Sequence, residues 1–135
     1  MHLHCYRWTG RGADRARESE RRPPHPAFPA SPLPPMRTCD WLLKPRTRID
    51  ASPATVAEAV AWLTRRYRSA AESFLHPDGE ARIGLDLRLH LAEEHLAGGV
   101  DVQWGIWLRG GDFITAAVIC CSPNRHAPHP CPAAS

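Results

Sequence analysis

Cysteine and histidine side chains, which hold zinc in many proteins, gather near the C-terminal end of this 135-residue sequence: Cys120, Cys121, His126, His129 and Cys131. A tetrahedral Zn²⁺ ion needs four such ligands, and a loop can fold several of them onto one ion. The spacing argues against this site, because neighbouring residues on a strand, such as Cys120 and Cys121, point to opposite faces. The chain also has no Cys-x2-Cys pair, and prolines stiffen the loop. Two interpretations stay open: a zinc centre built from these five residues, or a buried cysteine and an irregular tail with no cofactor.

Thiol chemistry is an alternative for the same residues. The chain has five cysteines, an odd number, and no recognisable secretory signal, so we expect free thiols and a cytoplasmic protein. A reversible disulfide could join Cys131 to Cys120 or Cys121. A small enzyme with Cys121 as its nucleophile would need a base such as His126. Because the sequence contains no nucleophile elbow, phosphate-binding loop or His-Glu-x-x-His motif, whether it is an enzyme stays uncertain, and we lean against it.

Aromatic residues suggest a binding surface. Trp62 lies off the apolar stripe of its expected helix, and Trp107 points to the sheet face opposite Trp104. An exposed tryptophan often marks a contact with a partner. The candidate surface consists of Trp62, Trp107, Gln103 and Arg109.

One long amphipathic helix is predicted over residues 53–75. Ser52 suits the N-cap and Pro53 the first helical position. Apolar side chains then recur every three or four residues, which places them on one face: Val56, Val60, Leu63, Tyr67, Ala70 and Phe74.

Three antiparallel strands are expected to pack against this helix, at residues 82–90, 100–109 and 112–121. Residues 82–90 alternate between leucine or isoleucine and smaller or polar residues, the period of a half-buried strand. An alternative for this segment is one helix from Glu80 to Ala97. The last two strands form a hairpin, because Gly110-Gly111 supplies the positive φ angles of a tight turn. The run 112–121 is apolar on both faces, which favours the central position.

Both ends of the chain are expected to be disordered. Residues 1–35 carry six arginines, three acids and half of the prolines, and hence the whole net charge of +3. Their few large apolar side chains predict a disordered tail, and the change of character at Met36 suggests that translation begins there. His2, His4 and Cys5 form a second group of ligand types that this start would remove. Residues 122–135 form a Pro/His/Cys-rich irregular tail after a single small domain over 36–121.

These patterns predict a small α+β domain from a GC-rich genome, since residues with GC-rich codons (Ala, Arg, Gly and Pro) dominate its composition. The leading hypothesis is a non-enzymatic cytoplasmic accessory or binding domain with an unknown protein partner, or one that self-associates. A nucleic-acid partner is disfavoured, because acids interrupt the arginines and no aromatic residues lie among them. No apolar run reaches 18 residues, so no membrane association is expected.

Overall fold

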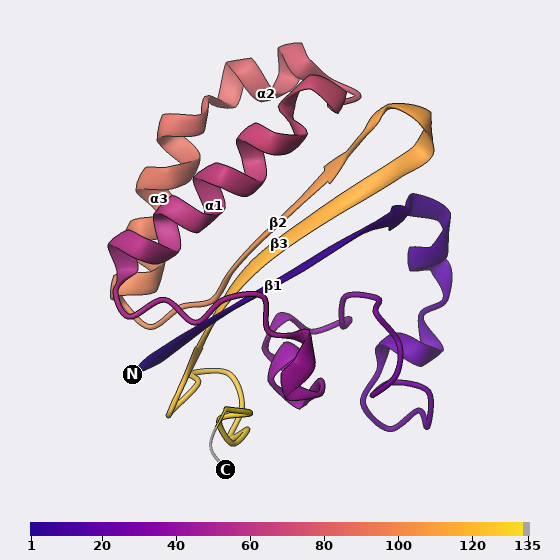
Figure 1. The fold of residues 1–135 in the computed structure, drawn as a ribbon, viewed down its shortest axis with the longest axis vertical. Helices are drawn as coiled ribbons and strands as arrows, with labels where there is room; N and C mark the ends of the chain where they lie inside the picture. The colour runs from indigo at the N-terminus through magenta and orange to yellow at the C-terminus, as the bar shows by residue number, and fades with distance from the viewer. Residues whose placement is uncertain (134–135) are drawn as a thin grey trace.

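The computed structural model describes residues 1–133 and has a three-stranded antiparallel sheet with helices on one face (Figure 1). The strands are β1 (His2–Arg11), β2 (Val102–Trp107) and β3 (Asp112–Cys121), in the order β1-β3-β2. The expected α+β class is confirmed, and the apolar β3 is the central strand. Gly110 and Gly111 have φ angles of 81° and 84°, which an L side chain rarely adopts, and they turn the chain from β2 into β3.

The two faces of the sheet are covered by different parts of the chain. We call one the helical face: Leu3, Cys5, Trp104, Val118 and Cys120 pack there under α1 (Val56–Ala70) and α3 (Leu85–Ala97). We call the other the loop face: it carries Tyr6, Trp8, Phe113, Ile119 and Cys121. The loop face is covered by the irregular chain between β1 and α1, including a 3-10 helix at Thr38–Leu43, and by the C-terminal segment (Figure 1). The start of β1 and the end of β3 lie at the same end of the sheet, because His2 pairs with Cys121.

The single helix over 53–75, capped by Ser52, is wrong in its bounds. Helix α1 begins at Val56, because the Thr55 side chain accepts a hydrogen bond from the Glu58 N–H at 3.1 Å. Glu58 in turn accepts from the N–H of Ala54, the residue before the cap, at 2.8 Å, so the pair resembles a Thr-x-x-Glu capping box shifted by one residue. The helix ends at Ala70, and a short 3-10 helix, Ala71–Ser73, follows it.

The strand predicted at 82–90 is wrong, because this segment is helical and the missing third strand is β1. Helix α2 (Pro77–Ile83) meets α3 at Gly84, whose φ of +82° breaks the helical path. Inward residues of α3 recur at helical spacing: Leu85, Leu89, Ala92 and Leu96. The intervening leucines are exposed on the outer surface, so the alternation reflects a helix that is apolar on two sides.

The disordered tail expected over residues 1–35 is also wrong. Strand β1 pairs with β3 from His2↔Cys121 to Arg11↔Asp112. The proline-rich stretch is ordered by buried cations: Arg21 donates to Pro34 O at 2.6 Å, and Lys44 donates to Phe28 O and Ser31 O at 2.8 Å. Side-chain donors thus satisfy carbonyl groups that a proline-rich backbone cannot pair in a ladder.

The C-terminal segment has no helix or strand over residues 122–133, yet its disorder is not supported either. Asn124 donates to both carboxylate oxygens of Asp101 at 3.0 Å and to Cys120 O at 2.7 Å. Arg125 donates to Gly98 O at 2.9 Å. Residues 134–135 of the predicted tail lie outside the described residues. In the part of the chain that the structure describes, no helix is long and apolar enough to span a membrane.

Candidate metal centre

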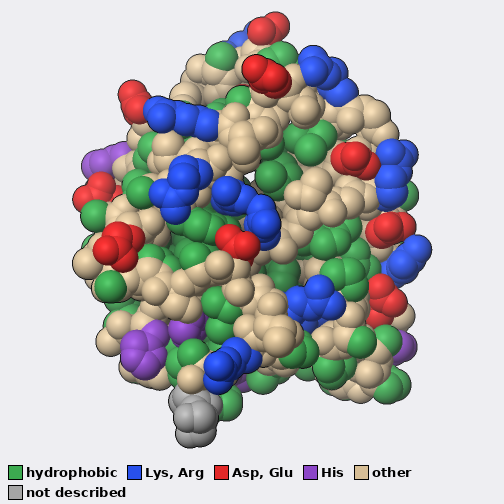
Figure 2. Space-filling model, viewed as in Figure 1, with side chains coloured by type: hydrophobic (Ala, Val, Ile, Leu, Met, Phe, Trp, Pro, Cys, Tyr) green, Lys and Arg blue, Asp and Glu red, His purple; other side chains and the backbone are tan. Residues whose placement is uncertain are grey.

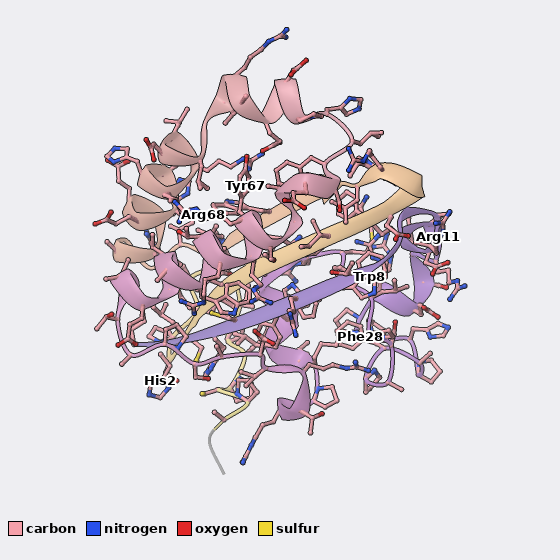
Figure 3. The ribbon with its side chains drawn as sticks, turned by 45° about the horizontal axis from the view of Figure 1, so that its top comes forward. His2, Trp8, Arg11, Phe28, Tyr67 and Arg68 are labelled. Carbon is pink, nitrogen blue, oxygen red and sulfur yellow. The ribbon has the colours of Figure 1, made fainter. Side chains whose placement is uncertain are left out.

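Three of the four side chains of the candidate centre come from the paired ends of β1 and β3. His2 and His4 are two residues apart on β1, so both point to the loop face. Cys121 lies directly across from His2 in the β1–β3 register and therefore shares that face. His2 is at the start of β1, and the figure shows it at one end of the sheet (Figure 3).

The fourth side chain, Cys131, comes from the C-terminal segment, which folds back over the loop face. Its Sγ atom lies 3.3 Å from His4 Nε2 and 3.5 Å from His2 Nδ1. Donor atoms of His2, His4, Cys121 and Cys131 all lie within 4.8 Å of one another. Tetrahedral Zn²⁺, with bonds of about 2.3 Å to sulfur and about 2.0–2.1 Å to nitrogen, separates its ligand atoms by roughly 3.4–3.8 Å. The cluster is therefore close to the size of a Cys₂His₂ zinc centre.

Two polar groups near the cluster bear on metal binding at this position. The other ring nitrogen of His4, Nδ1, lies 2.8 Å from Ser52 Oγ. When Nδ1 carries the proton and donates to Ser52, Nε2 is free to bind a metal. The Tyr6 hydroxyl is buried in the same core cluster as Cys121 and Cys131 and has no hydrogen-bond partner. A buried hydroxyl without a partner is unfavourable, so this side of the cluster has a polar group that is still unsatisfied.

The two thiols of the cluster differ in acidity. Burial opposes ionisation of Cys131, but its hydrogen bonds with His4 and His2 outweigh this effect and lower the pKa of the thiol to about 6. Burial and the hydrogen bond with Cys131 raise the pKa of Cys121 to about 12. One thiolate is thus available near neutral pH, and a bound cation would favour ionisation of the second.

Only Cys121 and Cys131 of the five predicted ligands are in this cluster. Cys120 points to the helical face, where its N–H donates to Asp101 at 2.8 Å, and His126 is exposed. His2 and His4 replace them. The sequence signal for this pair was the His-x-His spacing, which places both imidazoles on one face of a strand; reading residues 1–35 as disordered hid it.

His129 belongs to a second group of ligand types, with Cys39 and Asp40. Its Nε2 lies 2.9 Å from Asp40 Oδ1, and the Cys39 thiol lies 3.8 Å from the same oxygen. Donor atoms of the three residues are again within 4.8 Å of one another. His126 belongs to neither group among the described residues, so the structure does not place it beside Cys121 as a base. All five cysteines are free thiols.

The predicted binding surface is divided in the structure. Trp62 is buried on the helical face, and its Nε1 donates to Asp50 Oδ2 at 2.8 Å. Trp107 is 42% exposed, and Gln103 lies on the same side of β2, where its amide oxygen accepts from Trp41 Nε1. Arg109 is exposed at the hairpin and donates to Glu72 O. Gln103, Trp107 and Arg109 thus lie along β2 and the hairpin that follows it, whereas Trp62 is buried and does not belong to this surface.

Comparison of the chain with known proteins finds no matching family model, curated protein or solved structure. The functional proposals below therefore rest on the arrangement of the side chains.

The space-filling view shows histidine side chains gathered close to one end of the molecule (Figure 2).

Proposed function

We propose that this chain is a zinc-binding domain in which one structural ion, held by His2, His4, Cys121 and Cys131, fastens the C-terminal segment to the sheet. The observation that carries the proposal is the convergence of four zinc-type donor atoms within 4.8 Å, from chain segments more than a hundred residues apart. Four protein ligands leave no open position on a tetrahedral ion, which is typical of structural zinc.

A structural ion suits the way the C-terminal segment is attached. Among the described residues, 122–133 make no backbone–backbone hydrogen bond with the rest of the fold. Side chains therefore attach this segment to the sheet. Without a metal, the Cys131 thiol has weak sulfur contacts with His2, His4 and Cys121. A zinc ion would replace these contacts with coordinate bonds and contribute its binding free energy to folding.

Neighbouring cysteines provide a matched test. The full chain, purified without a histidine tag, is analysed for bound zinc together with the variants Cys121→Ala and Cys120→Ala. Both substitutions remove one buried thiol from β3, but only Cys121 faces the cluster. We expect Cys121→Ala to lose one zinc equivalent and Cys120→Ala to keep it. A parent protein with less than about 0.3 equivalents would overturn the proposal, since structural zinc binds far more tightly than that.

A non-enzymatic binding role, through self-association, is a second candidate function. Leu87 and Leu91 are one helical turn apart on α3 and are 49% and 43% exposed, and Ile83, at the end of α2, is 46% exposed. Strand β2 is an edge strand whose outer side is paired at its C-terminal end, where the Leu75 N–H donates to Trp107 O at 3.0 Å. The strand carries no charged residue or proline, which are the usual protections of an edge strand. Both features favour a second copy of this chain as the partner.

Light scattering at tens of micromolar tests the second candidate. We expect a dimer that Leu87→Glu dissociates. Leu43→Glu, at an exposed site on the 3-10 helix of the loop face, should leave the dimer intact. A monomeric parent would count against self-association. The free thiols of this chain favour a reducing compartment, and we place both functions in the cytoplasm as part of the proposal.

A further inference from the structure

The second group of ligand types, Cys39, Asp40 and His129, is more buried than an ordinary surface ion pair. Asp40 is 3% exposed and Cys39 is 4% exposed, and both belong to the 3-10 helix at Thr38–Leu43. His129 comes from the C-terminal segment, and its side chain is 18% exposed. The three side chains offer one sulfur, one oxygen and one nitrogen donor. This mixed set suits zinc or a similar divalent ion better than magnesium or calcium, which prefer oxygen ligands.

A cavity of about 780 Å³ lies against this group, with Asp40 and His129 on its wall. Arg22, His25 and Arg37 also line it, so the cavity is rich in positively charged or ionisable groups. The rest of the wall is mainly apolar: Pro23, Pro24, Pro26, Met36 and Leu43. Basic groups on an apolar wall suit a small organic anion, whose charge pairs with guanidinium groups and whose carbon skeleton contacts the prolines.

We propose that Cys39, Asp40 and His129 hold a second divalent metal ion with an open coordination position facing this cavity, and that this position takes a small organic carboxylate. Three protein ligands and one open position are the arrangement that allows a zinc ion to bind an exchangeable ligand. A carboxylate would give one oxygen to the metal and would be attracted by Arg22 and Arg37. Arg37 also donates to His126 O at 3.2 Å, and Arg22 forms an exposed ion pair with Glu18 at 3.6 Å.

This second site is independent of the proposed structural zinc in its ligands, although the two share the C-terminal segment. His129 and Cys131 are two residues apart, so the first ion helps to keep His129 near Asp40. Loss of the first ion therefore removes one positioning contact, whereas loss of the second leaves all four ligands of the first in place.

Native mass spectrometry of the full chain after loading with Zn²⁺ separates the two sites. We expect two ions on the parent, one on His129→Gln and one on Cys121→Ala. His126→Gln, at a neighbouring exposed histidine, is the matched control and should keep two. Two ions on both His129→Gln and Asp40→Asn would overturn the second site and leave His129 and Asp40 as an ion pair. Two ions on Cys121→Ala would instead overturn the structural centre alone. Thermal unfolding in the presence of a chelator shows whether each variant folds. If Asp40→Asn does not fold, the number of ions on His129→Gln, which changes the less buried ligand, decides the test.

The open position is tested with benzoate on the Co²⁺-loaded Cys121→Ala variant, in which we expect an ion at the second site alone. The double variant Cys121→Ala/His129→Gln is the control for any Co²⁺ that stays on His2, His4 and Cys131. Benzoate should change the visible absorption of the bound Co²⁺ in a saturable way. Arg22→Gln should weaken this response about tenfold, the effect of losing one charge-assisted hydrogen bond. Arg17→Gln, which removes an exposed arginine paired with Asp14 away from the cavity wall, should leave the response unchanged. An absorption spectrum that does not respond to benzoate, or equal effects of the two arginine substitutions, would overturn the assignment of the ligand.

Discussion

The different roles of Ser52 and Thr55 give the sharpest prediction. From the sequence, Ser52 is the expected N-cap of the main helix. In the structure the cap is Thr55, and Ser52 Oγ instead lies 2.8 Å from His4 Nδ1. The variants Ser52→Ala and Thr55→Ala each remove one hydroxyl group from the same short segment. They should therefore affect different properties, one the affinity for zinc and the other the stability of the helix.

The magnitudes follow from these two contacts. Losing the partner of a metal-bound histidine typically weakens metal affinity about 10- to 100-fold. Ser52 is exposed, so water can partly replace its hydroxyl, and we expect an effect near tenfold, or about 1.4 kcal/mol. Thr55→Ala should leave zinc affinity unchanged and should lower the free energy of unfolding of the metal-free protein by about 1 kcal/mol, the usual effect of losing an N-cap.

Two measurements on each variant are sufficient. Zinc affinity is obtained by competition with a chromophoric chelator, and stability by urea unfolding with EDTA present. The reasoning is refuted if Ser52→Ala binds zinc within twofold of the parent, or if Ser52→Ala destabilises the metal-free protein as much as Thr55→Ala does. The second result would mean that Ser52 caps the helix after all.

Three further predictions concern the fold. A chain that begins at Met36 lacks β1 and should show no cooperative thermal transition by circular dichroism; a sharp transition would mean that β1 is dispensable. Burial lowers the pKa of Lys44 from 10.5 to about 8, so between these values the unfolded chain binds more protons and stability should rise with pH. Between these two pH values, the free energy of unfolding of the parent should rise by up to roughly 3 kcal/mol relative to that of Lys44→Met, as measured by urea unfolding. If the free energies of unfolding of the two proteins change with pH in parallel, the prediction is wrong. Gly84→Ala should destabilise the protein by about 1–2 kcal/mol in the same assay because φ there is +82°, whereas Gly79→Ala, inside α2, should not destabilise it.

Local signals in the sequence were sufficient for the C-terminal hairpin and for the existence of the main helix. The apolar run at 112–121 matches β3 residue for residue, and the Gly110-Gly111 turn lies where it was predicted. Alternation in 82–90 was misleading, because leucines on two sides of a helix produce the same pattern as a half-buried strand. In that segment the packing of α3 against α1 and the sheet decided the structure, and the periodicity did not.

For the candidate site, the sequence supplied the residue types but not their combination. Five cysteines and eight histidines make a metal centre conceivable, and two of the four ligands, Cys121 and Cys131, are among the C-terminal residues that the sequence indicates. The choice of Cys121 over Cys120 depends on which face of β3 each side chain occupies. The choice of His2 and His4 depends on the pairing of β1 with β3, a contact between opposite ends of the chain. Strand register is set by tertiary packing, so only the folded structure could bring these four side chains together.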